Sequence, residues 1–291
     1  MATPIQAMRD AAGPGAVLVG VIGSPVAHSL SPELHQAAFR ALGLSDWQSF
    51  AYEIPPGRAG EALDEVRSAR LRGISVTMPH KADVAGLVDE CSDVARRLDA
   101  VNCVVNRDGV LFGTNTDGQG FVASLERGAG FSVAGRRCLV IGAGGAARAV
   151  VLALADAGAS EVAVMNRTES RAEEAAALAG SMGRVAEMGD DSAVAAADLV
   201  VNATPVGMTD GGGDGNGESW LVSPDSLHPS QVAADLVYVP RPTPWLAAVS
   251  ARGVTTVDGL GMLVHQAAAQ IELWTGQPAP VAAMWESVTA S

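Results

Sequence analysis

The stretch "RCLVIGAGGAARAVVLALADAGASEVAVMNRT", residues 137–168, decides the fold of this chain. An apolar strand-like run enters a glycine-rich turn, an alanine-rich helical segment follows, and "EVAVMN" (161–166) indicates a second strand. Within this G-x-G-x-x-A turn, Gly142 permits the tight turn, Gly144 lets a pyrophosphate approach the backbone, and Ala147 keeps helix and strand close. Because the motif lies between a strand and a helix, it predicts a dinucleotide site with the pyrophosphate at the helix N-terminus.

The end of the second strand indicates which dinucleotide binds. NAD sites usually place a carboxylate there for the ribose 2′-hydroxyl. This chain has Asn166, Arg167 and Thr168 instead, with Arg171 shortly after. These side chains would give a 2′-phosphate charge-assisted hydrogen bonds, so NADP is the predicted cofactor. The alternative is that both arginines only solvate the start of a helix, close to Glu169.

The residues before this stretch predict a separate α/β unit. After an N-terminal segment expected to be flexible, strand patterns alternate with helix patterns, which predicts parallel connections. Ser31 is the expected N-cap of the first helix, Pro32 its first helical residue, and Gly43 its end. The expected strands cover 16–23, 49–54 and 73–78, and the expected helices cover 31–43 and 59–71.

A second unit is expected to begin near Asp117 and to continue through strands at 197–208 and 231–238. Between them lies a glycine-rich loop at 209–220, and "VPRPTPWL" (239–246) predicts a stiff turn into a helix. The helix expected at 259–276 is assigned back to the first domain, with one face formed by Leu263, Ala267, Gln270 and Trp274. The predicted fold is therefore α/β with two domains flanking a cleft: a discontinuous α/β domain, 1–116 plus 259–291, and a Rossmann-type dinucleotide-binding domain, 117–258.

Composition limits the classes of function. The 291 residues are 48% hydrophobic and 18% charged with a net charge of -13, which disfavours general binding to nucleic acid or anionic membranes. No signal peptide pattern and no long apolar run is evident, so we predict a cytoplasmic protein. The histidines are scattered without metal-ligand spacing, so no metal is predicted. The cysteines are expected to be buried free thiols: Cys91, Cys103 and Cys138.

Several polar clusters remain unexplained by the fold. "GISVTMPHK" (73–81) delivers Lys81 directly after a strand, which by itself is compatible with an ordinary surface lysine. Similar clusters are "HSLSP" at 28–32, "AVN" at 100–102, "NTDGQGF" at 115–121, and Gln266. Each has an ordinary interpretation as a cap, a turn or a solvated group.

Together with the cofactor turn, these clusters resemble the shikimate dehydrogenase family. The resemblance runs in order along nearly the whole chain, through "GSPVAHSLSPELH", "GISVTMPHK", "GTNTDGQGF", "IGAGGAARA", "NRT", "NATPVGM", "DLVYVPRPTPWL" and "GMLVHQAAAQIELWTG". It implies NADP-dependent, reversible reduction of 3-dehydroshikimate to shikimate in aromatic amino acid biosynthesis. The implied partner is this small-molecule substrate, and a monomer or a homodimer remains possible.

The resemblance also assigns roles to residues. It implies that Lys81 and Asp117 form the catalytic pair, that Ser29 and Ser31 hold the substrate carboxylate, and that Tyr238 lies where substrate and nicotinamide meet. The implied contacts with the ring hydroxyls come from Asp117 and from Thr77, Asn102 and Gln266. The implied cofactor contacts are Gly142, Ala143, Gly144, Gly145, Ala146, Asn166, Arg167, Thr168, Arg171, Thr204, Gly259 and Met262.

Two positions depart from the family pattern. Ser75, which is also an expected substrate contact, stands where the family usually has asparagine. Cys103 stands where threonine is common. A serine offers one hydroxyl in place of an amide, so the substrate could differ. A quinate or aminoshikimate dehydrogenase of the same family is the alternative, and a non-catalytic protein that senses NADPH or shikimate is a remote one.

Overall fold

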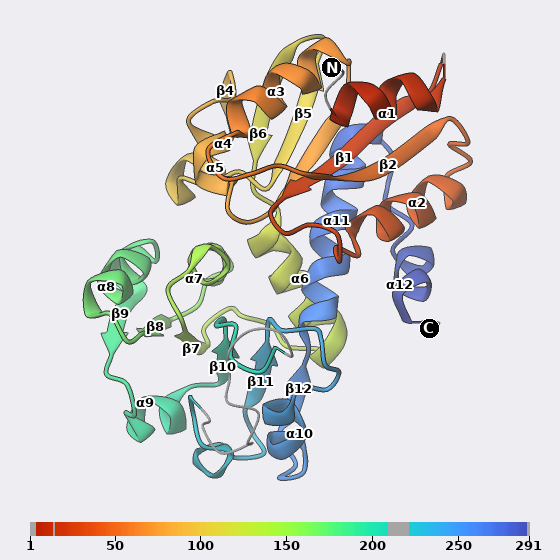
Figure 1. The fold of residues 1–291 in the computed structure, drawn as a ribbon. Helices are drawn as coiled ribbons and strands as arrows, with labels where there is room; N and C mark the ends of the chain where they lie inside the picture. Colours follow the sequence, from red (N-terminus) through yellow and green to blue (C-terminus); the bar gives the residue numbers. More distant parts are fainter. Residues whose placement is uncertain (1–3, 14, 209–220, 290–291) are drawn as a thin grey trace. The chain divides into compact units, whose positions relative to one another are not determined.

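The structure is a computed structural model in which residues 4–13, 15–208 and 221–289 are described. The chain divides into two compact units (Figure 1): unit 1 comprises Met1–Thr116 and Gln266–Ser291, and unit 2 comprises Asp117–His265. The chain returns to unit 1 at Gln266, seven residues later than the expected boundary at 258/259. The loop expected at 209–220 lies outside the described residues.

Unit 2 contains a six-stranded sheet in the order β12-β11-β10-β7-β8-β9, and every pair of neighbours is parallel. The central strand β7 has neighbours from both halves of the unit, so the strand order reverses between β7 and β10. This is the order of a doubly wound Rossmann sheet, whose ligands bind where the order reverses. The strands are β7 (Arg137–Ile141), β8 (Glu161–Met165), β9 (Gly183–Ala186), β10 (Leu199–Asn202), β11 (Val232–Asp235) and β12 (Thr255–Val257).

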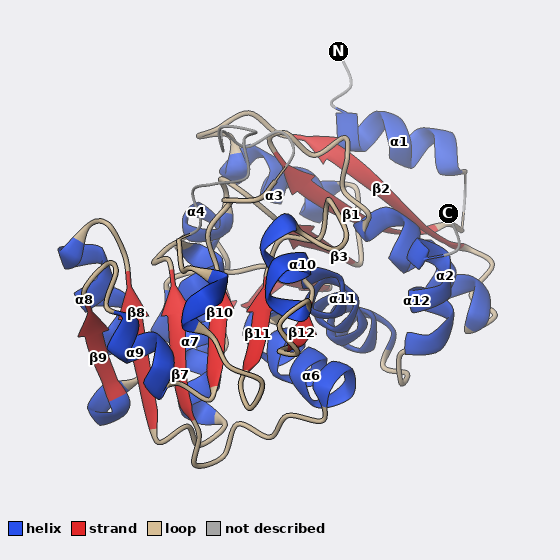
Figure 2. Ribbon diagram, turned by 90° about the horizontal axis from the view of Figure 1, so that it is seen from below, coloured by secondary structure: helices blue, strands red, loops and turns tan. Residues whose placement is uncertain are grey.

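Helices cover both faces of this sheet (Figure 2). Alternate strand residues such as Val140 and Val164 join one buried cluster with α6, α7 and α8, whereas Ile141 and Met165 join another with α9 and α10. Strands buried on both faces explain the nearly continuous apolar runs in the sequence. The helices are α6 (Asp117–Ala129), α7 (Gly145–Asp156), α8 (Glu169–Ala177), α9 (Asp191–Ala196) and α10 (Pro244–Ser250).

Unit 1 also contains a six-stranded sheet, in the order β2-β1-β3-β5-β6-β4. The three strands expected from sequence pair in parallel, but β5 pairs antiparallel with both β3 and β6, so the purely parallel prediction was wrong. The β5–β6 pair is a hairpin whose turn residues Asp108 and Gly109 both have positive φ, 54° and 99°. The strands are β1 (Val17–Gly23), β2 (Trp47–Glu53), β3 (Gly73–Val76), β4 (Glu90–Cys91), β5 (Cys103–Arg107) and β6 (Val110–Thr114).

The segment expected to be flexible is helical instead. In α1 (Pro4–Ala12), Ile5 is fully buried and Met8 packs against the same cluster, at the i, i+3 spacing of one helix face. These side chains meet Leu63 and Val66 of α3 and the inner residues of the sheet. The remaining N-terminal helices are α2 (Ser31–Ala41), α3 (Ala59–Ser68), α4 (Lys81–Ala85) and α5 (Asp93–Leu98).

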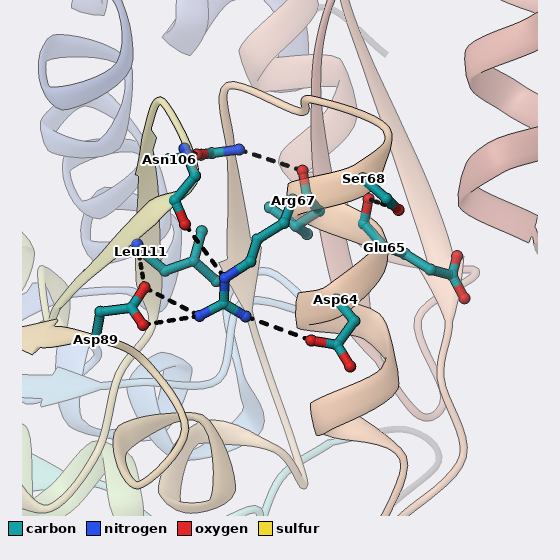
Figure 3. Close-up of polar contacts among 9 residues, drawn as sticks. Asp64, Glu65, Arg67, Ser68, Asp89, Asn106 and Leu111 are labelled. Carbon is teal, nitrogen blue, oxygen red and sulfur yellow. Dashed lines mark hydrogen bonds and ion pairs between the residues drawn. The ribbon is translucent and has the colours of Figure 1, made fainter.

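Polar contacts tie α3 to the hairpin (Figure 3). Arg67 Nη2 donates to Asp89 Oδ2 at 2.9 Å, and the same carboxylate accepts from Leu111 N at 2.7 Å. Asn106 Nδ2 on β5 donates to Val66 O at 3.2 Å and to Leu71 O, which follows the helix, at 2.9 Å. The backbone bond from Leu111 and then the Arg67 bond hold the pKa of Asp89 below its usual value. The helix is thereby fixed against the edge of the sheet.

The end of the chain completes unit 1. Trp274, near the end of α11 (Gly259–Thr275), donates from Nε1 to Val104 O on β5 at 3.0 Å. A Cβ on Gly73 would lie 2.3 Å from that nitrogen, so only glycine lets the helix approach the sheet this closely. The last helix, α12 (Val281–Thr289), packs against α2 (Figure 1). The C-terminal residues are therefore part of the unit 1 core.

The burial of the three cysteines agrees only partly with the expectation from the sequence. All three cysteines are free, and Cys103 and Cys138 are buried, but Cys91 is only half-buried, because its strand lies at the edge of the sheet. Burial raises the pKa of Cys138 to about 12. In the described part of the chain, no group of three acidic, histidine or cysteine side chains could hold a metal ion. None of the described helices has the length and hydrophobicity that a membrane crossing requires.

Candidate functional site

The glycine-rich turn of unit 2 lies where the strand order reverses. Gly142 follows β7 with φ +112°, and a Cβ there would lie 2.9 Å from Ala203 O and 3.1 Å from Thr204 Cγ2. The loops after β7 and β10 therefore touch, and this contact requires glycine. Thr204 is held in place because its N and Oγ1 donate to Asn202 Oδ1 at 3.0 and 2.7 Å.

The start of α7 leaves room for a ligand. Gly144 is the N-cap residue, and an added Cβ on Gly144 or Gly145 would meet nothing within 4 Å. The first helical hydrogen bond runs from Arg148 N to Gly144 O at 2.9 Å, so the N–H groups of the three residues between them point out of the helix end. An open glycine surface at the positive end of a helix fits a pyrophosphate. Of the other predicted contacts, Ala143 lies in the glycine-rich turn and Ala146 lies in the first turn of α7.

The end of β8 carries the residues predicted to select NADP. Asn166 Nδ2 donates to Thr168 O at 2.9 Å and closes a tight turn before α8. Thr168 is the N-cap residue, yet its side chain makes no capping hydrogen bond. Arg167 and Arg171 are exposed, and neither makes an ion pair with any residue that the structure describes. The turn therefore presents positive charge, which fits a ribose 2′-phosphate.

A buried carboxylate organises the two loops that follow β10 and β11. Asp235 accepts from Asn202 Nδ2 and from Val237 N, both at 3.0 Å, and from Thr243 Oγ1 at 2.7 Å. Tyr238, half-buried, follows directly, and burial raises its pKa. The start of α11 packs against the same loop, because a Cβ on Gly259 would lie 2.1 Å from Leu236 O. Met262, on α11, packs against the core formed with α6, α7 and α8.

We expect Asp235→Asn to reduce the dependence of unfolding free energy on pH. Burial, which outweighs its hydrogen bonds, raises the pKa of Asp235 from 3.8 to about 6. A raised carboxyl pKa stabilises the folded state below pH 4, and this contribution is lost as pH rises through 6, at about 1.4 kcal/mol per pKa unit. Urea titrations of both proteins at pH 4 and pH 7 should show the variant gaining about 2–3 kcal/mol relative to the original between these values. Parallel curves would contradict this result.

In unit 1, the loops after β1 and β3 lie together. Ser24 N donates to Met78 O at 2.9 Å, and a Cβ on Gly23 would lie 2.4 Å from Thr77 Cγ2. Glu53 holds the first loop by accepting from Ser24 Oγ at 2.6 Å and from the backbone of the next turn. Both strands are parallel, so their polar ends meet at one edge of the sheet.

The predicted carboxylate-binding serines are neighbours, but the predicted N-cap was wrong. Ser29 Oγ accepts from Ser31 N at 3.3 Å. The N-cap of α2 is Leu30, Ser31 is already helical, and Pro32 lies in the first turn as expected. The reason is that Leu30 has helical dihedral angles and its carbonyl accepts from Leu34 N. Gly43 does end the helix, with φ +71°.

Lys81 opens α4 at the end of the loop that follows Thr77. Its carbonyl accepts from Val101 N at 2.8 Å, which ties the loop to the segment carrying Asn102. The side chain is half-buried. Lys81 is also the only lysine of the chain, since every other one of the 19 basic side chains is arginine. The preceding His80 is buried and pairs through Nε2 with Ile54 O at 2.7 Å.

A cluster of buried amides lies beside this loop. Asn102, 1% exposed, donates from Nδ2 to Thr116 Oγ1 at 3.0 Å and to Gln266 Oε1 at 3.4 Å. Thr116 N donates to Asn102 Oδ1 at 2.8 Å, and Thr116 Oγ1 donates to Gln266 O at 3.0 Å. Gln270 Nε2 adds a bond to Gln266 Oε1 at 2.9 Å. Segments about 150 residues apart in sequence are thus joined at one point.

The predicted site residues therefore fall into two groups. Lys81, Asn102 and Gln266 belong to one connected region of unit 1, and Ser75 lies on β3 beside Cys103 of β5. Asp117 opens α6 in unit 2, where a Cβ on the next residue, Gly118, would lie 2.6 Å from Ala149 O of α7. Sequence reasoning missed Thr116 and Gln270 as partners of the amides. The i, i+4 spacing of two glutamines in an apolar helix was the available signal.

Comparisons with known proteins agree along the chain. Residues 21–104 match the shikimate dehydrogenase substrate binding domain, 125–207 match shikimate / quinate 5-dehydrogenase, and 259–289 match the shikimate 5'-dehydrogenase C-terminal domain. The chain is 45% identical over 274 residues to shikimate dehydrogenase (NADP(+)) of Moorella thermoacetica, covering 92% of this chain and 90% of the relative.

Solved structures show the same fold. Shikimate 5-dehydrogenase from Listeria monocytogenes, in complex with shikimate and NAD, superimposes with a TM-score of 0.87 and 34% identity, covering 95% of this chain and 97% of that one. Quinate dehydrogenase from Corynebacterium glutamicum, in complex with NAD, superimposes with a TM-score of 0.86 and 31% identity, covering 95% of this chain and 99% of that one.

Proposed function

The chain belongs to the shikimate dehydrogenase family, and from this membership we propose that it catalyses the NADP-dependent, reversible reduction of 3-dehydroshikimate to shikimate. The observation that carries the proposal is that Asn102 Nδ2 donates to Gln266 Oε1 in unit 1, while the neighbouring Val101 N donates to Lys81 O. A cation and two amides in one small region match a ring with several hydroxyls. The proposal includes biosynthesis of aromatic amino acids and a cytoplasmic location.

Unit 1 is proposed to bind the substrate. Ser29 and Ser31 would donate to its carboxylate, and the Ser29 hydroxyl already accepts a hydrogen bond from Ser31 N. Thr77, Asn102 and Gln266 would contact the ring hydroxyls, together with Asp117 from the start of α6. Ser75 would lie near the same ring, where its single hydroxyl replaces the amide usual in the family.

Unit 2 is proposed to bind NADP, which supplies the hydride when bound. The turn from Gly142 to Ala146 would hold the pyrophosphate, because its backbone is open and stands at the start of α7. Asn166, Arg167, Thr168 and Arg171 would hold the 2′-phosphate. The remaining contacts, near the nicotinamide, would come from Thr204, Tyr238, Gly259 and Met262.

Proton transfer is assigned to Lys81 with Asp117. Reduction of a ring ketone requires a proton donor next to the developing alkoxide. A lysine can give up a proton, whereas an arginine stays protonated in proteins. Every other one of the 19 basic side chains is arginine, so Lys81 is the one that can exchange a proton. Asp117 would orient the ammonium and a substrate hydroxyl.

Initial-rate kinetics test the proposal. We expect oxidation of shikimate with NADP to be much faster than oxidation with NAD, and faster than oxidation of quinate or aminoshikimate. Comparable rates with quinate and NAD would instead favour the alternative function, which Ser75 keeps open. Binding of NADPH and shikimate without turnover would support a non-catalytic sensing protein and contradict the proposed enzyme.

A further inference from the structure

Unit 1 contains a buried imidazole that the proposed chemistry does not use. His35 of α2 is 0% exposed, its Nδ1 lies 2.9 Å from Ser49 Oγ, and its ring contacts Trp274 edge-on with centroids 5.0 Å apart. Burial lowers the pKa of His35 to about 3, and a side-chain interaction with Gln270 opposes this shift only in part. The imidazole is therefore neutral, with one nitrogen donating and the other accepting.

The second residue of the proposed pair is Gln270. Its Nε2 donates to Gln266 Oε1 at 2.9 Å and to Asn102 O at 3.2 Å, which uses both amide hydrogens. Its Oε1 is buried without a hydrogen-bond partner among the described residues, and the same holds for His35 Nε2. Gln270 also acts on the imidazole in the direction that raises the pKa of His35, as an acceptor oxygen facing a ring nitrogen does. A donor on His35 Nε2 is the group that Gln270 Oε1 requires.

We propose that His35 is a positioning residue for the substrate: with Nε2 protonated and directed at Gln270 Oε1, it fixes the Gln270 amide and, through it, the Gln266 amide. This inference rests on the proposed function. Rotating the Gln270 amide by half a turn would place its oxygen against Gln266 Oε1 and Asn102 O, and its nitrogen against His35 Nε2–H. Both ends of the side chain therefore favour the same orientation.

The consequence lies at Gln266. Its Oε1 accepts from both Gln270 and Asn102, so the opposite end of this amide, Nε2, is the donor end. Gln266 is then preorganised to donate to an oxygen of the substrate ring, rather than to accept from its hydroxyl. Preorganisation of this kind lowers the cost of binding without a new contact.

Steady-state kinetics of substitutions at position 35 test this connection from His35 through Gln270 to Gln266. His35→Phe keeps the ring beside Trp274 but removes both nitrogens, so the KM for shikimate should rise about tenfold or more while the KM for NADP stays the same. His35→Gln returns an N–H near the Nε2 position and should recover most of that affinity, whereas His35→Asn should not. Gln36→Leu is the matched control on α2, because the Gln36 side chain makes a single hydrogen bond with the described residues, to Trp47 O at 3.4 Å.

The decisive comparison uses Gln266→Ala. If His35 acts through Gln266, His35→Phe should have almost no additional effect on the KM for shikimate in the Gln266→Ala background. Equal effects in both backgrounds, or an unchanged KM in the single variant, would overturn the proposal. Should His35→Phe fail to fold, the contrast between the Gln and Asn variants decides in the same way.

A readout without turnover separates this inference from the proposed function. NMR of the protein with ¹⁵N-labelled histidine should show His35 as the neutral Nε2–H tautomer, and Gln270→Leu should shift its Nε2 resonance. The Nδ1–H tautomer would overturn the inference even if the enzyme oxidises shikimate. Conversely, absence of shikimate oxidation by the unaltered protein would count against the proposed function alone.

Discussion

Replacing Lys81 with arginine is expected to lower kcat for shikimate oxidation by about 10²- to 10⁴-fold, the usual contribution of a positioned proton-transfer group. The substitution keeps the positive charge and removes the ability to exchange a proton. Binding of NADPH should be unchanged, because its predicted contacts belong to unit 2, whereas Lys81 belongs to unit 1. Turnover measured by absorbance at saturating substrate, with NADPH affinity from fluorescence, checks both parts.

Lys81→Met is the companion variant, since it removes charge and proton together. If Lys81 moves a proton, the arginine and methionine variants should have similarly low kcat, and only the methionine variant should bind shikimate more weakly. A fully active arginine variant would show that Lys81 supplies charge alone. Because Lys81 is the only lysine, a lysine-directed reagent modifies one side chain, and shikimate should protect it.

Arg167→Ala is expected to reduce the preference for NADP over NAD by about tenfold or more. Charge-assisted hydrogen bonds contribute roughly 1.5–3 kcal/mol each, and about 1.4 kcal/mol corresponds to a tenfold change. The loss should appear as a higher KM for NADP with an unchanged KM for NAD, because only NADP carries the 2′-phosphate. The ratio of kcat/KM for the two cofactors measures the effect.

A second substitution at position 167 and a control at position 184 complete this test. Arg167→Asp should favour NAD, since a carboxylate there suits a ribose hydroxyl and repels a phosphate. Arg184→Ala is the matched control, because Arg184 pairs with Glu161 at 2.9 Å on the same sheet and is not a predicted contact. An unchanged cofactor ratio in Arg167→Ala would assign the selection to Thr168, Arg171 or neither.

Local sequence signals predicted seven of the twelve described strands, and among the helices they predicted α2, α3, α7, α10 and α11. The apolar run before Gly142 predicted β7, the glycine-rich turn and α7 in the correct order, because a Rossmann turn depends on neighbouring residues. The hairpin of β5 and β6 was missed although Asp108-Gly109 is a strong turn signal, since the surrounding strands were not recognised. Helix α1 was missed because its stability depends on Ile5 packing against residues distant in sequence.

In the candidate site too, features that depend on neighbouring residues were predicted, and features that depend on distant contacts were not. Family resemblance predicted site roles for Lys81, Asn102 and Gln266, but did not explain why the two amides are ordered. Their connection through Thr116 and Gln270 depends on where β6 ends and where α11 passes, which periodicity does not define. Asp235 was treated as part of a strand, and its role in joining two loops follows only from contacts with Asn202 and Thr243.

The discontinuity of unit 1 has a consequence for synthesis of the protein. Residues 117–265 are synthesised before Trp274 and Met284, both fully buried in the finished protein. All buried residues of the two core clusters of unit 2 therefore precede the C-terminal part of α11, to which β5 is hydrogen-bonded. Unit 1 is thus the last unit whose core residues are all synthesised, and its incomplete sheet is the surface that a chaperone would protect.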